Sequence, residues 1–273
     1  MAGFFGMFNF EKPGKGVYKD APQKRGFFLF FEILLRKFWR ISSLSLFYTL
    51  FSIPAFIIFY YLCVFVQGTF GITADPVLAH WLSIYLAVFL GAFMGTGPAS
   101  MGQAYVLRNF SRENHAWVWD DFREKAMENF GKGILFFVLD IVVVTILVGA
   151  ATLYFKYGNL MPMPPLMTAA CGFLAVFALF TYFMMHFFLY PLSVTMDMKA
   201  GKLLKTAFQL TMMKLPACTL IFFAAFIMFA LFFYLVYLNI GFLVLFAALG
   251  FSVVAFVYTF YSTSVIDEIL EER

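Results

Sequence analysis

Asp140 and His186 are the two residues whose types and positions could do chemistry inside an otherwise apolar chain. Asp140 interrupts the apolar stretch 134–155, and His186 lies shortly before Pro191 in the next one. A charged residue in a membrane-spanning helix costs about 2.5–3.5 kcal/mol on insertion scales, so such residues are functional candidates. We predict that the two form a polar site or proton relay. The alternative is that Asp140 reaches interfacial water or a lysine, while His186 bonds a backbone carbonyl.

A second candidate site is a predicted helix break at Gly95, Gly97 and Pro98. Gly91 and Gly95 also form a small-xxx-small pattern, which favours close approach of two helices. A broken helix could instead expose backbone carbonyls to a solute. Both interpretations stay open at this point.

The third candidate lies in the largest polar loop, where Trp117 and Trp119 flank Val118. Asp120 or Asp121 is expected to cap a helix that runs to about residue 132. The tryptophans suit a helix on the membrane surface, in the headgroup region. The alternative is a docking surface for a partner protein.

Other kinds of site are not indicated. The three cysteines and three histidines show no metal-ligand spacing, and no phosphate-binding glycine loop is present. Segments outside the apolar stretches are too short for a soluble catalytic domain. We therefore expect no metal, no cofactor, no enzymatic activity and no nucleic-acid binding, with the basic charge serving orientation and lipid attraction.

The composition defines the class of protein that must position these residues. The 273 residues are 63% hydrophobic and only 12% charged, whereas soluble domains carry roughly 25% charged residues. An ordinary soluble enzyme, a disordered chain and a secreted disulfide scaffold are excluded. The sequence predicts an all-α polytopic membrane protein, embedded in a lipid bilayer as a bundle of helices.

Long charge-free stretches and the breaks between them predict six spans. A spanning helix needs about 20 apolar residues, and the prolines at 162–165 and the turn at 239–241 divide the longer stretches. The predicted spans are about 43–66, 79–100, 134–155, 166–191, 216–237 and 242–262. Residues 26–273 would form one transmembrane domain, preceded by a cytoplasmic tail at 1–25.

The basic residues predict the orientation. Of the 19 Lys and Arg residues, only Lys156 falls on one side of the six predicted spans. The other side is therefore expected to be cytoplasmic, with both termini inside. Basic amphipathic segments at 27–40, 121–132 and 202–214 are expected to lie at that interface. For 27–40, a continuous extension of the first span is the alternative.

Several short motifs, in order along nearly the whole chain, resemble the YesL-type bacterial membrane proteins, a family of unknown function. They include Phe8-Asn9-Phe10-Glu11-Lys12-Pro13-Gly14, Leu35-Arg36-Lys37-Phe38-Trp39-Arg40, Gly97-Pro98-Ala99 and Tyr190-Pro191 followed by Leu203-Leu204-Lys205-Thr206-Ala207. Ser45 stands where the family often has Asn. The resemblance implies a bacterial inner-membrane protein with a supporting role in carbohydrate uptake or sensing. It implies no catalytic residues.

Two functions follow as hypotheses. The first is a non-enzymatic accessory or regulatory protein that contacts a membrane partner such as a sugar transporter. The second is a small-solute transporter or channel, with a path lined by Asp140, His186 and the break at Gly95–Pro98.

Overall fold

The computed structural model describes residues 26–71, 75–160 and 162–271, and this part of the chain is helical with no strand. Six of its helices are long and apolar enough to cross a membrane. The first part of the chain contains α1 (Phe27–Arg36), α2 (Phe38–Phe70), α3 (Pro76–Phe93), α4 (Pro98–Ser111) and α5 (Val118–Glu128). The second part contains α6 (Phe130–Tyr157), a 3-10 turn (Gly158–Leu160), α7 (Pro165–Thr195), α8 (Ala200–Met213), α9 (Leu215–Leu238), α10 (Phe242–Leu245), a π-helical turn (Phe246–Gly250) and α11 (Phe251–Glu271).

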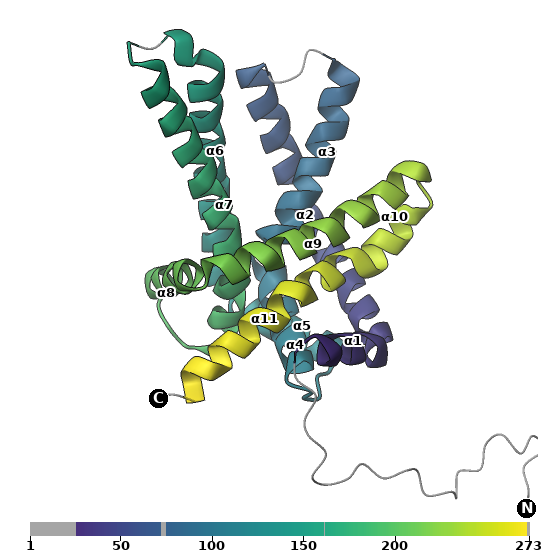
Figure 1. Ribbon diagram of the computed structural model, residues 1–273. Coiled ribbons are helices and arrows are strands. Elements are labelled where there is room, and N and C mark those ends of the chain that lie inside the picture. The colour runs from purple at the N-terminus through teal and green to yellow at the C-terminus, as the bar shows by residue number, and fades with distance from the viewer. Residues whose placement is uncertain (1–25, 72–74, 161, 272–273) are drawn as a thin grey trace, which may run out of the picture.

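The long helices form three hairpins, α2/α3, α6/α7 and α9 with α10–α11 (Figure 1). The first two hairpins extend toward the same side, and the third crosses them obliquely. The short helices α1, α4 and α5 lie together at the opposite side, and α8 packs on α7. We call the end of the molecule that carries α1, α4 and α5 the basic end, because Arg36, Arg112 and Lys125 lie there.

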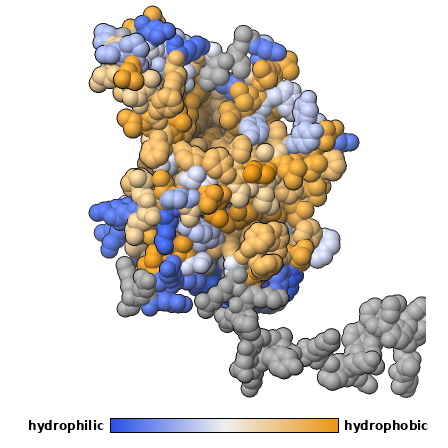
Figure 2. All heavy atoms as spheres, in the orientation of Figure 1, coloured by the Kyte–Doolittle hydropathy of each residue, from blue (hydrophilic) through white to orange (hydrophobic). Residues whose placement is uncertain are grey.

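The outer wall of the long helices is apolar (Figure 2). Large hydrophobic side chains on it are exposed, for example Ile227 at 66% and Phe173 at 66%. Exposing so many apolar side chains to water would be unfavourable, whereas lipid tails are as apolar as these side chains. The fold therefore supports a multi-pass protein in a lipid bilayer, as the composition predicts.

The second span ends earlier than predicted. It is helical only from Pro76 to Phe93, and α4 begins as a separate helix at Pro98. Gly95 and Gly97 between them have φ of 87° and 76°, a left-handed region that residues with a side chain rarely adopt. The predicted helix break is present, but it ends the span instead of interrupting it, so the predicted span 79–100 was too long.

The fourth span continues past the position at which it was predicted to end. Pro191 lies inside α7, which runs on to Thr195. The missing proline N–H leaves one carbonyl of the preceding turn without its helical donor. The last turn stays helical despite this loss, and α7 packs against α4 and α8.

The ends of the first and last spans also differ from the prediction. A break at Lys37 separates α1 from α2, so the amphipathic segment 27–40 is a distinct helix only as far as Arg36. The last span continues to Glu271 and contains the π-helical turn at Phe246–Gly250. There the carbonyl of Ala247 accepts hydrogen bonds from Ser45 (2.9 Å) and Thr49 (3.2 Å) of α2. The predicted tail 1–25 lies outside the described residues.

Ion pairs between helices gather at the basic end. Arg112, which directly follows α4, donates to Asp267 of α11 through two nitrogens. Arg36 donates a hydrogen bond to the Glu113 carboxylate, and this bond raises the pKa of Arg36. These contacts fix α1, α4 and α11 relative to one another.

Candidate functional site

Asp140 and His186 face each other in the interior of the bundle. Asp140 comes from α6 and His186 from α7, and each side chain is 1% exposed. His186 Nε2 lies 2.9 Å from Asp140 Oδ1, and the hydroxyl of Tyr182 donates to the same oxygen at 2.7 Å. His186 Nδ1 lies 2.9 Å from the backbone oxygen of Tyr182. The predicted pair is thus formed, and the alternative carbonyl contact of His186 is present beside it.

The geometry fixes how many protons the pair holds. A carbonyl oxygen only accepts, so His186 Nδ1 must carry a hydrogen. One further proton then lies between His186 Nε2 and Asp140, giving either an imidazolium beside a carboxylate or a neutral imidazole beside a carboxylic acid. Both forms have zero net charge, which avoids a lone charge in a medium of low dielectric constant. The pair is therefore suited to holding one proton between the imidazole and the carboxyl group.

Two buried polar atoms at this site have no hydrogen-bond partner within the described residues: Asp140 Oδ2 and the hydroxyl of Tyr190. Tyr190 lies one helical turn from His186, and their ring centroids are 6.0 Å apart. The ring of Tyr190 also packs on the helix break, since a Cβ on Gly95 would lie 2.7 Å from its Cε2 atom. Buried groups of this kind are usually paired with protein or water. Asp140 and Tyr190 thus have unused hydrogen-bonding capacity next to His186.

The break itself is closed by side chains from other helices. Tyr48 of α2 donates to the carbonyl of Gly91 at 2.6 Å, and Tyr258 of α11 donates to Ala92 at 3.2 Å. The Ser100 hydroxyl accepts from the backbone N–H of Thr96 at 2.7 Å. These bonds satisfy groups that a helix end would otherwise leave open. The break is consequently a junction whose backbone groups are held by side chains of α2, α4 and α11.

On the other side of the pair lies an apolar cavity of about 230 Å³ between the first two hairpins. Its wall includes Val144 of α6 and Phe183 of α7. Val144 lies four positions after Asp140, and Phe183 lies three positions before His186. Each separation is roughly 5–6 Å along the helix. Cys63 and Gln67 of α2 also line the cavity. The protonatable pair therefore lies about one helical turn from a space that points away from the basic end.

Lys156 joins the two hairpins beyond this cavity. Its Nζ atom donates to the carbonyls of Phe70 and Gly71, at 2.7 Å each. These carbonyls belong to the end of α2, where the helix dipole favours a cation. The contact connects the last turn of α6 to the last turn of α2, so it restrains how far the hairpins can separate.

The predicted surface helix exists but has different ends. It begins at Val118 and stops at Glu128, because Asn129 ends it before α6 starts. Asp121 does not precede the helix as a cap; it lies in the first turn and accepts from the N–H of Trp117 at 2.8 Å. Trp117 is 68% exposed, whereas Trp119 packs on Phe47 of α2 with ring centroids 5.0 Å apart. Trp117, Trp119 and Asp121 thus all lie at the start of α5, but they do not form one continuous surface.

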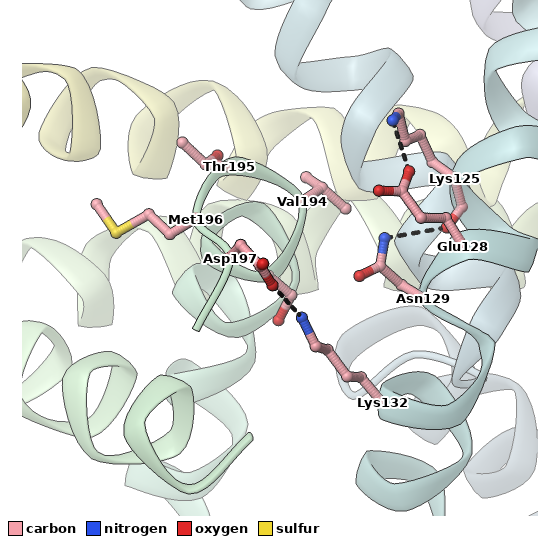
Figure 3. Close-up of a pocket in the computed structure, with 9 residues that line it drawn as sticks. Lys125, Glu128, Asn129, Lys132, Val194, Thr195, Met196 and Asp197 are labelled. Atoms are coloured by element: carbon pink, nitrogen blue, oxygen red, sulfur yellow. Dashed lines mark hydrogen bonds and ion pairs between the residues drawn. The ribbon is translucent and has the colours of Figure 1, made fainter. Parts of the chain in front are cut away.

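A polar pocket of about 370 Å³ lies at the basic end, between α5, the start of α6 and the end of α7 (Figure 3). Lys132 reaches Asp197 across it at 3.3 Å. Lys125 bonds Glu128 at 2.6 Å, and this hydrogen bond raises the pKa of Lys125. Its four charged groups are two cations and two anions, so the pocket carries no excess charge that would select a ligand.

Neither a family model, nor a curated protein, nor a solved structure matches the chain. The resemblance to the YesL-type proteins therefore stays a prediction. Among the described residues, no three His, Cys, Asp or Glu side chains are placed to hold a metal ion.

Sequence reasoning did not single out Tyr182 and Tyr190, which complete the site with Asp140 and His186. A signal was present, because 182, 186 and 190 follow one another at four-residue spacing and so lie on one helix face. A polar stripe of this kind on one face of an apolar span indicates an interior position.

Proposed function

We propose that this protein is a small-solute transporter in which Asp140 and His186 hold the coupling proton. The observation that carries the proposal is the buried Asp140–His186 pair, with its free carboxylate oxygen, one helical turn from the cavity between two hairpins. Ionisable residues in the interior of membrane bundles mark ion pathways and proton relays. The closed break at Gly95–Pro98 corresponds to a state shut toward the basic end.

In the orientation that goes with this proposal, the protein lies in the inner membrane of a bacterium. The basic end faces the cytoplasm, and both termini are on the cytoplasmic side. The basic residues of the sequence support it, because cytoplasmic loops carry the excess of Lys and Arg. The cavity between α2/α3 and α6/α7 then lies on the outer side of the pair, and Lys156 lies farther out, at the end of α6.

Proteoliposomes that contain a trapped pH-sensitive dye test the transport function. A panel of mono- and disaccharides is added outside under an inward proton gradient, because the family resemblance points to carbohydrates. At least one sugar is expected to accelerate acidification of the lumen. Asp140→Asn should abolish the acceleration, and Asp120→Asn, the same change on the exposed face of α5, should leave it intact. Rates equal to those of protein-free liposomes for every sugar would refute the proposal.

An accessory role beside a carbohydrate transporter is the second candidate. The observation that favours it is Trp117, which is 68% exposed at the basic end, next to His115. Exposed tryptophans are enriched at protein interfaces. Mild detergent extraction and co-purification with sugar-uptake proteins, compared between wild type and Trp117→Ala, tests this role. The same partners at the same yield from both proteins would exclude Trp117 as their docking site.

A further inference from the structure

A second hollow, separate from the transport site, lies on the lipid-facing wall near the basic end. It is a groove of about 490 Å³ between α2, α5 and the start of α6, with the helix break at its base. Its volume falls within the roughly 300–1,000 Å³ typical of small-molecule sites. Apart from Arg123 and Thr96, the residues that line it are apolar.

Small side chains and a proline explain why the groove exists. Ala55, Ala99 and Ala126 contribute short side chains from three helices, and Pro54 lies inside α2 beside them. Gly97 and Gly133 hold α6 close to the break, since a Cβ on Gly133 would lie 2.7 Å from the backbone nitrogen of Pro98. The close approach of the α6 backbone to Pro98 thus fixes the base of the groove.

The rim of the groove is made of exposed apolar side chains. Phe51 and Ile58 of α2 are 51% and 45% exposed, and Met127 of α5 is 66% exposed. Phe51 to Ile58 covers roughly 10 Å of helix, within the candidate span Phe38–Phe70. When α2 spans a bilayer, hydrocarbon surrounds this stretch. A flexible acyl chain can fill an apolar groove there, whereas water would find too few polar partners.

Arg123 supplies a charge at the same groove. It is exposed, and it has no ion pair with any residue that the structure describes. The neighbouring Lys125 differs, because it contacts Glu124 at 3.3 Å and Glu128 at 2.6 Å. An unpaired guanidinium beside an apolar groove matches an anionic phosphate above an acyl chain, and Arg binds phosphate in a bidentate manner.

We propose that this groove binds one acyl chain of an anionic phospholipid whose phosphate pairs with Arg123. Lipid binding does not require the transport function, because neither Asp140 nor His186 lines the groove; the two sites share only the helix break. A net negative headgroup is preferred over a zwitterionic one, and one basic residue near the surface gives a preference of about fivefold.

Trp119 provides a local probe, because its ring lies 5.9 Å from that of Phe51 on the groove rim. A protein whose other three tryptophans are replaced by Phe is reconstituted into phosphatidylcholine vesicles. Small fractions of brominated phosphatidylglycerol or brominated phosphatidylcholine are then added, and quenching of Trp119 is measured. Brominated phosphatidylglycerol should quench at about one fifth of the concentration that brominated phosphatidylcholine needs.

Two variants and one control decide between specific binding and general lipid contact. Arg123→Gln should remove the preference for phosphatidylglycerol, and Ala126→Phe should fill the groove and reduce quenching by both lipids. Lys202→Gln on the exposed face of α8 should change nothing. Equal quenching by both lipids in the unaltered groove would overturn the proposal. A preference that survives both variants would place the lipid elsewhere and overturn it as well.

Discussion

The buried Asp140–His186 pair makes a strong prediction about stability. Replacing His186 with Leu leaves Asp140, at 1% exposure, with Tyr182 as its one remaining hydrogen-bond donor. Removing one partner of a buried ion pair costs about 3–5 kcal/mol. For a chain of this size each kcal/mol shifts Tm by about 2–4 °C, so the single variant should melt about 6–20 °C below the wild type.

Replacing both members should cost less than replacing one. In the double variant Asp140→Val with His186→Leu, no charge is left to bury, and such replacements are often neutral or stabilising. The Tyr182 hydroxyl loses its acceptor at Asp140, which costs about 1–3 kcal/mol. The double variant should therefore recover roughly half of the Tm lost by His186→Leu alone.

Buried cysteines provide the assay. Cys63 and Cys218 are buried, so a fluorogenic thiol reagent reacts with them as the protein unfolds in detergent. The partly exposed Cys171 is replaced by Ser in all variants. If His186→Leu melts at the wild-type temperature, the pair is not coupled as its geometry indicates. Additive losses in the double variant would contradict the argument equally.

Three further predictions test the surroundings of the pair. Gly97→Ala should lower Tm by more than about 4 °C, because a Cβ at Gly97 would lie 2.8 Å from the backbone oxygen of Gly133. Gly131→Ala is the control and should not lower Tm, because a Cβ at Gly131 would have no atom within 4 Å. Lys156→Gln should speed labelling of Cys63 by a small thiol reagent in folded protein by loosening the two hairpins, and an unchanged rate would show that Lys156 does not restrain them. Tyr190→Phe removes an unpartnered hydroxyl, so it should leave Tm within about 2 °C while lowering proton flux; a full flux would exclude Tyr190 from the proton path.

Much of this fold could be predicted from composition and charge, because both report directly on the bilayer. A charge-free apolar stretch of sufficient length forms a spanning helix regardless of which helices pack against it. All six predicted spans therefore correspond to helices. Their ends could not be predicted as well. A proline in a span indicates a helix end, yet Pro191 lies inside α7, which runs on to Thr195.

The site was predictable in part for a similar reason. A charged residue in a span is conspicuous in sequence, so Asp140 could be found directly. Its contact with His186 depends on how α6 and α7 face each other, whereas the four-residue spacing of Tyr182, His186 and Tyr190 is a local pattern that was missed. The cavity and the groove are still less accessible to sequence reasoning, because each arises from several helices that leave space between short side chains.

The central claim is that Asp140 and His186 share one proton, with Nδ1 of His186 already committed to a carbonyl. Nitrogen-15 NMR of histidine-labelled protein in liposomes tests it most directly, since His80→Gln and His115→Gln leave His186 as the one labelled ring. We predict a protonated Nδ1 between about pH 5 and pH 8 and an Nε2 resonance that moves in Asp140→Asn. An Nδ1 without its proton would contradict this proposal, and so would an Nε2 chemical shift that is unchanged in Asp140→Asn.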